Sequence, residues 1–183
     1  MYNKIVVALD LSDANKQVFM KALSLAKAGG ASLLLLHVLS KEEKTSPLLS
    51  GYLSHPKSRS IHIPSEILQK ANKAFQKEWQ EFEQKGIEML NSFAKKGISE
   101  GVATEFIQIT GHPSSTICEY AHSSCADLIV IGRRGHSRLQ EVMLGSVSNY
   151  VIHHSPCSVL LVQTPVVQES NSAERRKNMV YIY

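Results

Sequence analysis

The sequence lacks several features that mark familiar classes of protein. Its 183 residues contain only three cysteines, Cys118, Cys125 and Cys157, and no CxxC pair, which excludes a disulfide scaffold and favours a reducing compartment. The longest apolar stretch, 33–39, contains a histidine and is too short to cross a membrane. The first apolar run, 5–9, ends at an aspartate without the cleavage site of a secretory signal. We therefore expect a cytoplasmic protein that does not enter a membrane.

The motifs of common nucleotide-dependent enzymes are also missing. The sequence contains no GxxxxGK(S/T) pattern, which forms a P-loop, and no GxGxxG follows the first expected strand. Serine, histidine and acidic residues form no recognisable triad, and spacing alone cannot establish one. Because no general base is evident, we expect a binding protein, with at most weak hydrolysis of a bound nucleotide.

Positive charge is scattered along the chain rather than gathered. The net charge is +4, and only 133–134 and 175–177 form short basic clusters. Proteins that bind nucleic acid usually concentrate positive charge on one face. The sequence therefore predicts a solvated charged surface and no nucleic-acid partner.

Five short segments have the composition of buried strands: 5–9, 32–38, 102–109, 128–131 and 159–162. Most are apolar on both faces, which is typical of a parallel sheet covered by helices. Helical patterns separate them, and this alternation predicts an α/β fold. The third segment is the most polar, so we expect it at an edge of the sheet. The last is fully apolar, so it needs a cover if it also lies at an edge. A second subunit would provide one, and a further strand formed by 179–183 is the alternative.

Helical patterns follow each of the first four strands. Ser12 or Asp13 is expected to cap the first helix, and Gly29–Gly30 to end it. The remaining expected elements are a loop over 40–63 and helices over 64–96, over 114–124 and after Gly145.

An apolar stripe marks the long helix expected over 64–96. Its members recur every three or four positions, which is the spacing of one helical face: Phe75, Trp79, Phe82, Gly86, Met89 and Phe93. We interpret the stripe as core packing against the sheet. A helix this long exceeds an ordinary strand, so its first turns are expected to overhang the sheet. The single domain would span 1–164, followed by a tail over 165–183.

The most informative segment follows the fourth strand, where Gly132, Gly135, Gly145 and Ser146 recur at fixed spacing. Gly132 lets the backbone approach a ligand closely, and Gly135 permits a sharp turn. A helix that begins at Gly145–Ser146 presents amide groups without acceptors inside the helix, and its dipole also favours an anion there. The hydroxyl groups of Ser146 and Ser148 would donate to phosphate oxygens. The segment therefore predicts a triphosphate site.

This segment resembles the ATP-binding branch of the universal stress protein family, whose pattern is G-x2-G-x9-G-(S/T). The flanking segments 127–132, 144–148 and 154–162 are similar to those of family members, as are 5–12 and 111–113. The resemblance implies a Rossmann-like, five-stranded parallel sheet of order 3-2-1-4-5, of the adenine-nucleotide alpha hydrolase-like type, with helices on both faces. In such a sheet the ligand binds where the strand order reverses. Leu11 departs from the glycine often found at that position.

The resemblance also implies a set of nucleotide-binding residues. Residues at the ends of the first two strands would border the adenine, and the glycine segment would hold the ribose and phosphates. The full set is Ala8, Asp10, Val38, Ile131, Gly132, Arg134, Gly135, Gly145, Ser146, Val147 and Ser148. The ligand would be ATP, or else ADP, AMP or a cyclic nucleotide. Mg²⁺ held by Asp10 is an additional option.

Several residues have two interpretations. Asp10 either contacts the ligand or caps the following turn. Arg133 and Arg134 either reach a phosphate or point to water, and 40–63 is either a lid or an idle loop. Three residues that share one helical face are either zinc ligands or, more commonly for such residues, ordinary core and surface positions: Cys118, His122 and Cys125.

The function implied by the resemblance is nucleotide-dependent sensing or regulation in a stress response. It also implies a homodimer joined through the fifth strand, at 157–163. Two other functions stay open, namely a slow ATPase and a nucleotide-free dimeric interaction protein of the same fold.

Overall fold

Strands and helices alternate along the part of the chain that the computed structural model describes, which comprises residues 1–41, 43, 46–47, 65–133 and 144–163. In chain order the elements are β1 (Lys4–Leu9), α1 (Asn15–Gly29), β2 (Ser32–Leu39), α3 (Ser65–Ser99), β3 (Thr104–Thr110), α4 (Pro113–Ser123), β4 (Leu128–Gly132), α5 (Ser146–His154) and β5 (Ser158–Val162). Every strand and helix expected from the sequence is present, with bounds shifted by up to three residues. Most of the loop over 40–63 and the tail lie outside the described residues.

The five strands form one parallel sheet of order β3-β2-β1-β4-β5. This order confirms the expected α/β fold. The polar strand β3 lies at one edge, as its composition predicts, and several of its side chains are exposed. Strand β5 lies at the other edge, where three of its apolar side chains are only partly buried.

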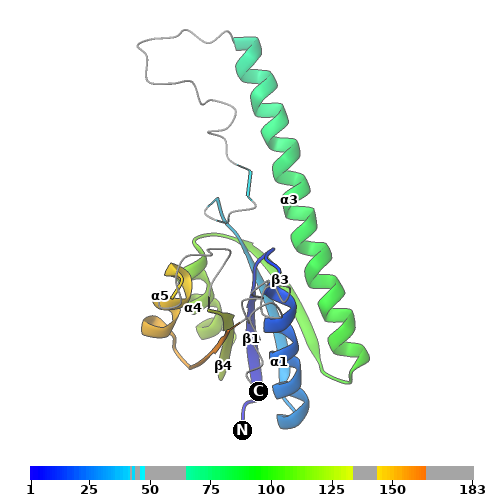
Figure 1. Cartoon of the computed structure of the whole chain (residues 1–183), viewed down its shortest axis with the longest axis vertical. Coiled ribbons are helices and arrows are strands. Elements are labelled where there is room, and N and C mark those ends of the chain that lie inside the picture. Colours follow the sequence, from blue (N-terminus) through cyan, green and yellow to red (C-terminus); the bar gives the residue numbers. More distant parts are fainter. Residues whose placement is uncertain (42, 44–45, 48–64, 134–143, 164–183) are drawn as a thin grey trace, which may run out of the picture.

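Helices cover both faces of the sheet and enclose two separate cores (Figure 1). On one face, α1 and α3 pack against the strands, and the rings of Phe19 and Phe93 stack with centroids 4.5 Å apart. On the other face, α4 and α5 contribute Ile117, Ala121 and Val151 to the second core. Because the central strands are covered on both sides, their sequences are almost continuously apolar.

Helix α1 begins later than expected, and the capping prediction for Ser12 or Asp13 is wrong. The residue before the helix is Ala14, and no side chain in the described part of the chain caps the first turn. The hydroxyl of Ser12 instead donates to the carboxylate of Asp10, within the turn that precedes the helix. It therefore does not cap the helix. The end of the helix agrees with the prediction, since Gly30 adopts a left-handed φ of 69°, which favours glycine.

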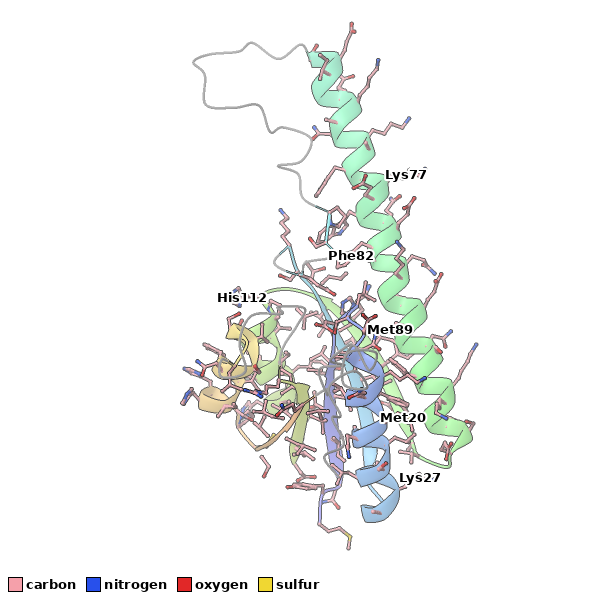
Figure 2. All side chains as sticks on the ribbon, in the orientation of Figure 1. Met20, Lys27, Lys77, Phe82, Met89 and His112 are labelled. Carbon is pink, nitrogen blue, oxygen red and sulfur yellow. The ribbon has the colours of Figure 1, made fainter. Side chains whose placement is uncertain are left out.

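Helix α3 extends well beyond the sheet, on the side where the strands end (Figure 1). Its lower half confirms the predicted core stripe, because Met89 and Phe93 pack against the first core and Phe82 is buried. Figure 2 shows Phe82 and Met89 on this helix. The prediction is wrong for Phe75 and Trp79, which are only partly buried and belong to neither core among the described residues. They form a ring contact with each other, and Trp79 also contacts Phe82.

Among the residues that the structure describes, none of the helices combines the length and the apolar character that crossing a bilayer requires.

Candidate functional site

The strand order reverses at the carboxyl ends of β1 and β4, and the candidate site lies there. Ala8 in β1 is paired with Ile131 in β4, so Asp10, just after β1, and Gly132, at the end of β4, lie at the same edge of the sheet. The chain leaves β1 towards β2 on one side, whereas β4 lies on the other. A switch of this kind leaves room for a ligand beyond the strand ends.

Four of the predicted residues gather on one face of the sheet. Val38 and Ile131 are buried in the second core, and Ala8 and Val147 pack against it. Leu9 is paired with His37, which places Val38 level with Asp10. The structure therefore brings together apolar side chains from β1, β2, β4 and α5 next to the strand ends. They form an apolar surface against which a flat apolar ring would pack.

Backbone hydrogen bonds fasten the start of the glycine segment to its end. The amide of Arg133 donates to the carbonyl of Val162 at 2.9 Å, and the amide of Gly145 donates to the carbonyl of Arg133 at 3.2 Å. The hydroxyl of Ser148 donates to the carbonyls of Arg133 and Gly145, at 2.9 and 3.0 Å. Ser148 is buried, so this hydroxyl holds the loop against α5 rather than pointing outwards. Arg134 and Gly135 lie outside the described residues.

The start of α5 offers hydrogen-bond donors towards the same edge. Gly145 is its N-cap residue, and no acidic residue lies in its first turn. Among the residues that the structure describes, no side chain caps that turn. The first amide groups of a helix have no acceptor within the helix, and they carry the positive end of its dipole. Ser146 is exposed and Gly145 is partly buried. This combination suits an anionic group.

Asp10 takes part in the turn that follows β1. Its Oδ1 accepts hydrogen bonds from the amide of Ser12, at 3.1 Å, and from the Ser12 hydroxyl. The side chain of Asn15 donates to the carbonyl of Asp10 at 3.3 Å. These contacts match the capping interpretation of Asp10. They engage one carboxylate oxygen, and a ligand contact would use the other.

Two residues near the site were not singled out from the sequence. Glu43 accepts a hydrogen bond from the amide of Leu11 at 2.8 Å, and its other oxygen lies 3.1 Å from Nε2 of His37. His37 is fully buried. The available signal was a histidine inside an otherwise apolar strand, which requires polar partners once it is buried.

No three His, Cys, Asp or Glu side chains come close enough to hold a metal ion within the described ranges. The alternative zinc site at Cys118, His122 and Cys125 is therefore not formed. Cys118 is buried in the second core, and burial raises the pKa of its thiol, with smaller contributions from Cys157 and Glu119.

Comparison with known proteins gives a consistent result. The family model described as Universal stress protein family matches residues 1–163. Universal stress protein Sll1388 of Synechocystis is 37% identical over 162 residues, which are 88% of this chain and 98% of that protein.

Solved structures share the fold at lower identity. The protein MJ0577 has a TM-score of 0.66 and 22% identity, with 91% of this chain and 99% of that chain covered. The AMP-bound protein At3g01520 of Arabidopsis thaliana has a TM-score of 0.57 and 20% identity, with 94% and 98% covered. Two further universal stress proteins, in complex with cAMP and with dAMP, have TM-scores of 0.53 and 0.51.

Proposed function

The chain belongs to the universal stress protein family, and on this premise we propose that it binds an adenine nucleotide where the strand order reverses. Nucleotide occupancy would regulate its interactions in a stress response. The observation that carries the proposal is the start of α5, which no side chain of the described residues caps. This start is joined through Arg133 to the end of β4 and has no acidic residue in its first turn. Solved family members of the same fold bind AMP, cAMP or dAMP, which supports this ligand class.

Each part of the nucleotide would meet a different group of residues. The apolar residues Ala8, Val38 and Ile131 would pack against the adenine, with Val147 beside the ribose. The amide of Ser146, in the first turn of α5, would hold a phosphate oxygen, because it has no acceptor within the helix. The further members of the proposed site are Asp10, Gly132, Arg134, Gly135 and Ser148, the last as a brace for the loop.

ATP is the nucleotide that we propose, since the spacing of Gly132, Gly135, Gly145 and Ser146 is that of the ATP-binding branch. A triphosphate carries more negative charge than AMP, so it would gain most from the dipole of α5 and from a neighbouring arginine. Asp10 would be the carboxylate that holds a Mg²⁺ ion on such a ligand.

The proposal is tested by the nucleotide content and the binding curve of the purified protein. Mass spectrometry of ligand released on denaturation is expected to detect an adenine nucleotide. Isothermal titration calorimetry of stripped protein with ATP, AMP and cAMP is expected to give saturable binding with a Kd below about 1 mM for at least one of them. Absence of saturation with all three would leave the chain with the family fold and without this function.

We also propose that two copies associate through β5, in the segment 157–163. The strand lies at a sheet edge, and its apolar side chains are only partly covered. A bare apolar edge promotes association, and a second copy would bury it. Sedimentation equilibrium at micromolar concentration is expected to give twice the chain mass of 20.3 kDa. A mass of one chain throughout would contradict the dimer.

A further inference from the structure

A chain of polar contacts, centred on the buried side chain of His37, connects α3 to the turn after β1. The side-chain amide of Gln108 donates to the carbonyl of Glu83 at 3.0 Å, and its oxygen lies 2.8 Å from Nδ1 of His37. Nε2 of His37 lies 3.1 Å from one oxygen of Glu43, and the other oxygen of Glu43 accepts the amide of Leu11 at 2.8 Å. The contacts cross β3 and β2 and end beside Asp10.

The contacts determine which form of His37 fits the site. Gln108 donates its amide group to a backbone carbonyl, so its oxygen must face His37. Both ring nitrogens of His37 therefore face oxygen acceptors, and only the doubly protonated imidazolium donates from both. Burial by itself lowers the pKa of His37. The hydrogen bonds to Glu43 and Gln108, with the negative charges of Glu43 and Asp10, outweigh burial and raise that pKa above its ordinary value.

The helix that covers His37 leaves little room for another arrangement. Gly86 of α3 lies so close that an added Cβ would come 2.5 Å from Nδ1 of His37 and would also collide with Gln108. The rings of Phe82 and His37 meet in a T-shaped arrangement, with centroids 6.2 Å apart. These contacts fix the imidazole ring of His37. When the ring is protonated, Glu43 therefore has a cation in a constant position. Loss of that cation would leave a half-buried carboxylate without its charge partner.

We propose that His37 and Glu43 are positioning residues of the nucleotide site, which hold the Asp10–Leu11 turn in its binding geometry only while His37 is protonated. The inference rests on the proposed function and adds regulation by pH to it. Glu43 fixes the turn through the amide of Leu11, and protonated His37 fixes Glu43. Protonated His37 also offsets the two carboxylates that would otherwise repel an anionic ligand.

The groups that act on His37 come from each neighbouring element. Within the described residues, Glu43 and Asp10 are the ionisable groups that change its pKa. Strand β3 presents the neutral Gln108, and α3 presents Phe82, Gly86 and a backbone carbonyl. The pKa of His37 is raised in the folded protein. The stabilisation that protonated His37 gives to Glu43 and the turn is therefore complete at pH values below the ordinary pKa of 6.5. It is lost as the pH rises through the higher pKa of the folded state.

The test is calorimetric titration with AMP from pH 6 to 9, on the wild type, Glu43→Gln and Glu83→Gln. The affinity of the wild type is expected to fall about fivefold or more as His37 loses its proton. Glu43→Gln should lose this pH dependence, because the uncharged amide makes no ion pair with His37. Glu83→Gln removes an equal charge nearby but keeps the carbonyl that binds Gln108, so it should follow the wild type. Titration of the AMP phosphate is common to all three and cancels in the comparison.

Measurements on the nucleotide-free wild type test the same inference without a substitution. NMR is expected to give a titration of the His37 ring, and the exchange of the Leu11 amide should lose its protection over the same pH interval.

The outcomes separate the two proposals. Equal pH dependence of AMP affinity in the wild type and Glu43→Gln, or a Leu11 amide indifferent to the state of His37, would overturn the positioning role and leave nucleotide binding intact. Failure of the wild type to bind AMP, ATP or cAMP at any pH would overturn the proposed function, and the positioning role with it.

Discussion

Replacement of Gly145 by glutamate is expected to weaken AMP binding about 100-fold, or about 2.7 kcal/mol. The new carboxylate would stand at the start of α5, where the ligand phosphate is expected, and two like charges there repel each other. The fold should tolerate the change. Gly145 has φ −64° and ψ 151°, which is extended backbone that any residue adopts, and an acidic group near a helix N-terminus stabilises the helix. Calorimetric titration of the variant measures the loss.

Gly145→Gln is the matched control, because it has the same length without the charge. Its affinity is expected to stay within about tenfold of the wild type, since the loss should come mainly from like-charge repulsion. Equal affinities of the two variants would show that bulk rather than charge matters at this position. Wild-type affinity in both would mean that the phosphate lies elsewhere.

Replacement of Phe19 by alanine is expected to lower the free energy of unfolding by about 3–5 kcal/mol. Phe19 is fully buried between α1, α3 and the sheet, and its ring stacks on Phe93. Its removal would leave a cavity where two helices and a sheet meet, which a rigid core fills only in part. Urea unfolding followed by circular dichroism gives the difference between variant and wild type.

The adjacent residue provides a control on the same helix. Met20 is 39% exposed, so Met20→Ala should change the free energy of unfolding by no more than about 1 kcal/mol. A cost below that value for Phe19→Ala would mean that the space closes around the smaller side chain, and that α1 and α3 are less tightly held than their contacts indicate.

The sheet could be predicted from the sequence because burial on two faces leaves a strong pattern. The runs at 33–39 and 128–131 are almost wholly apolar, and the polar residues of β3 place it at an edge. The glycine spacing from Gly132 to Ser146 likewise directs attention to the candidate site, because such spacing depends on local backbone geometry. The resemblance to the universal stress protein family supplied the strand order, which the structure confirms.

The remaining features depend on contacts between distant residues. No local pattern connects Glu43 with the amide of Leu11, because that hydrogen bond exists only after β1 and β2 have paired. The capping prediction for α1 was wrong for a related reason. The Ser12 hydroxyl donates its hydrogen bond to the carboxylate of Asp10 and not to the helix. For Phe75 and Trp79, the helical period correctly gives one face of α3, but it carries no information on where the sheet beneath that face ends.

Alternation along β2 has a mechanical consequence. His37 contacts the layer formed by α3, whereas its neighbour Val38 belongs to the core beneath α4 and α5. Successive side chains of a strand point to opposite faces, so one peptide unit joins the two layers at the edge where the nucleotide is proposed to bind. A shift of the long helix at His37 would thus act on the apolar residues beside the proposed ligand through the backbone of β2, which is paired with both β1 and β3.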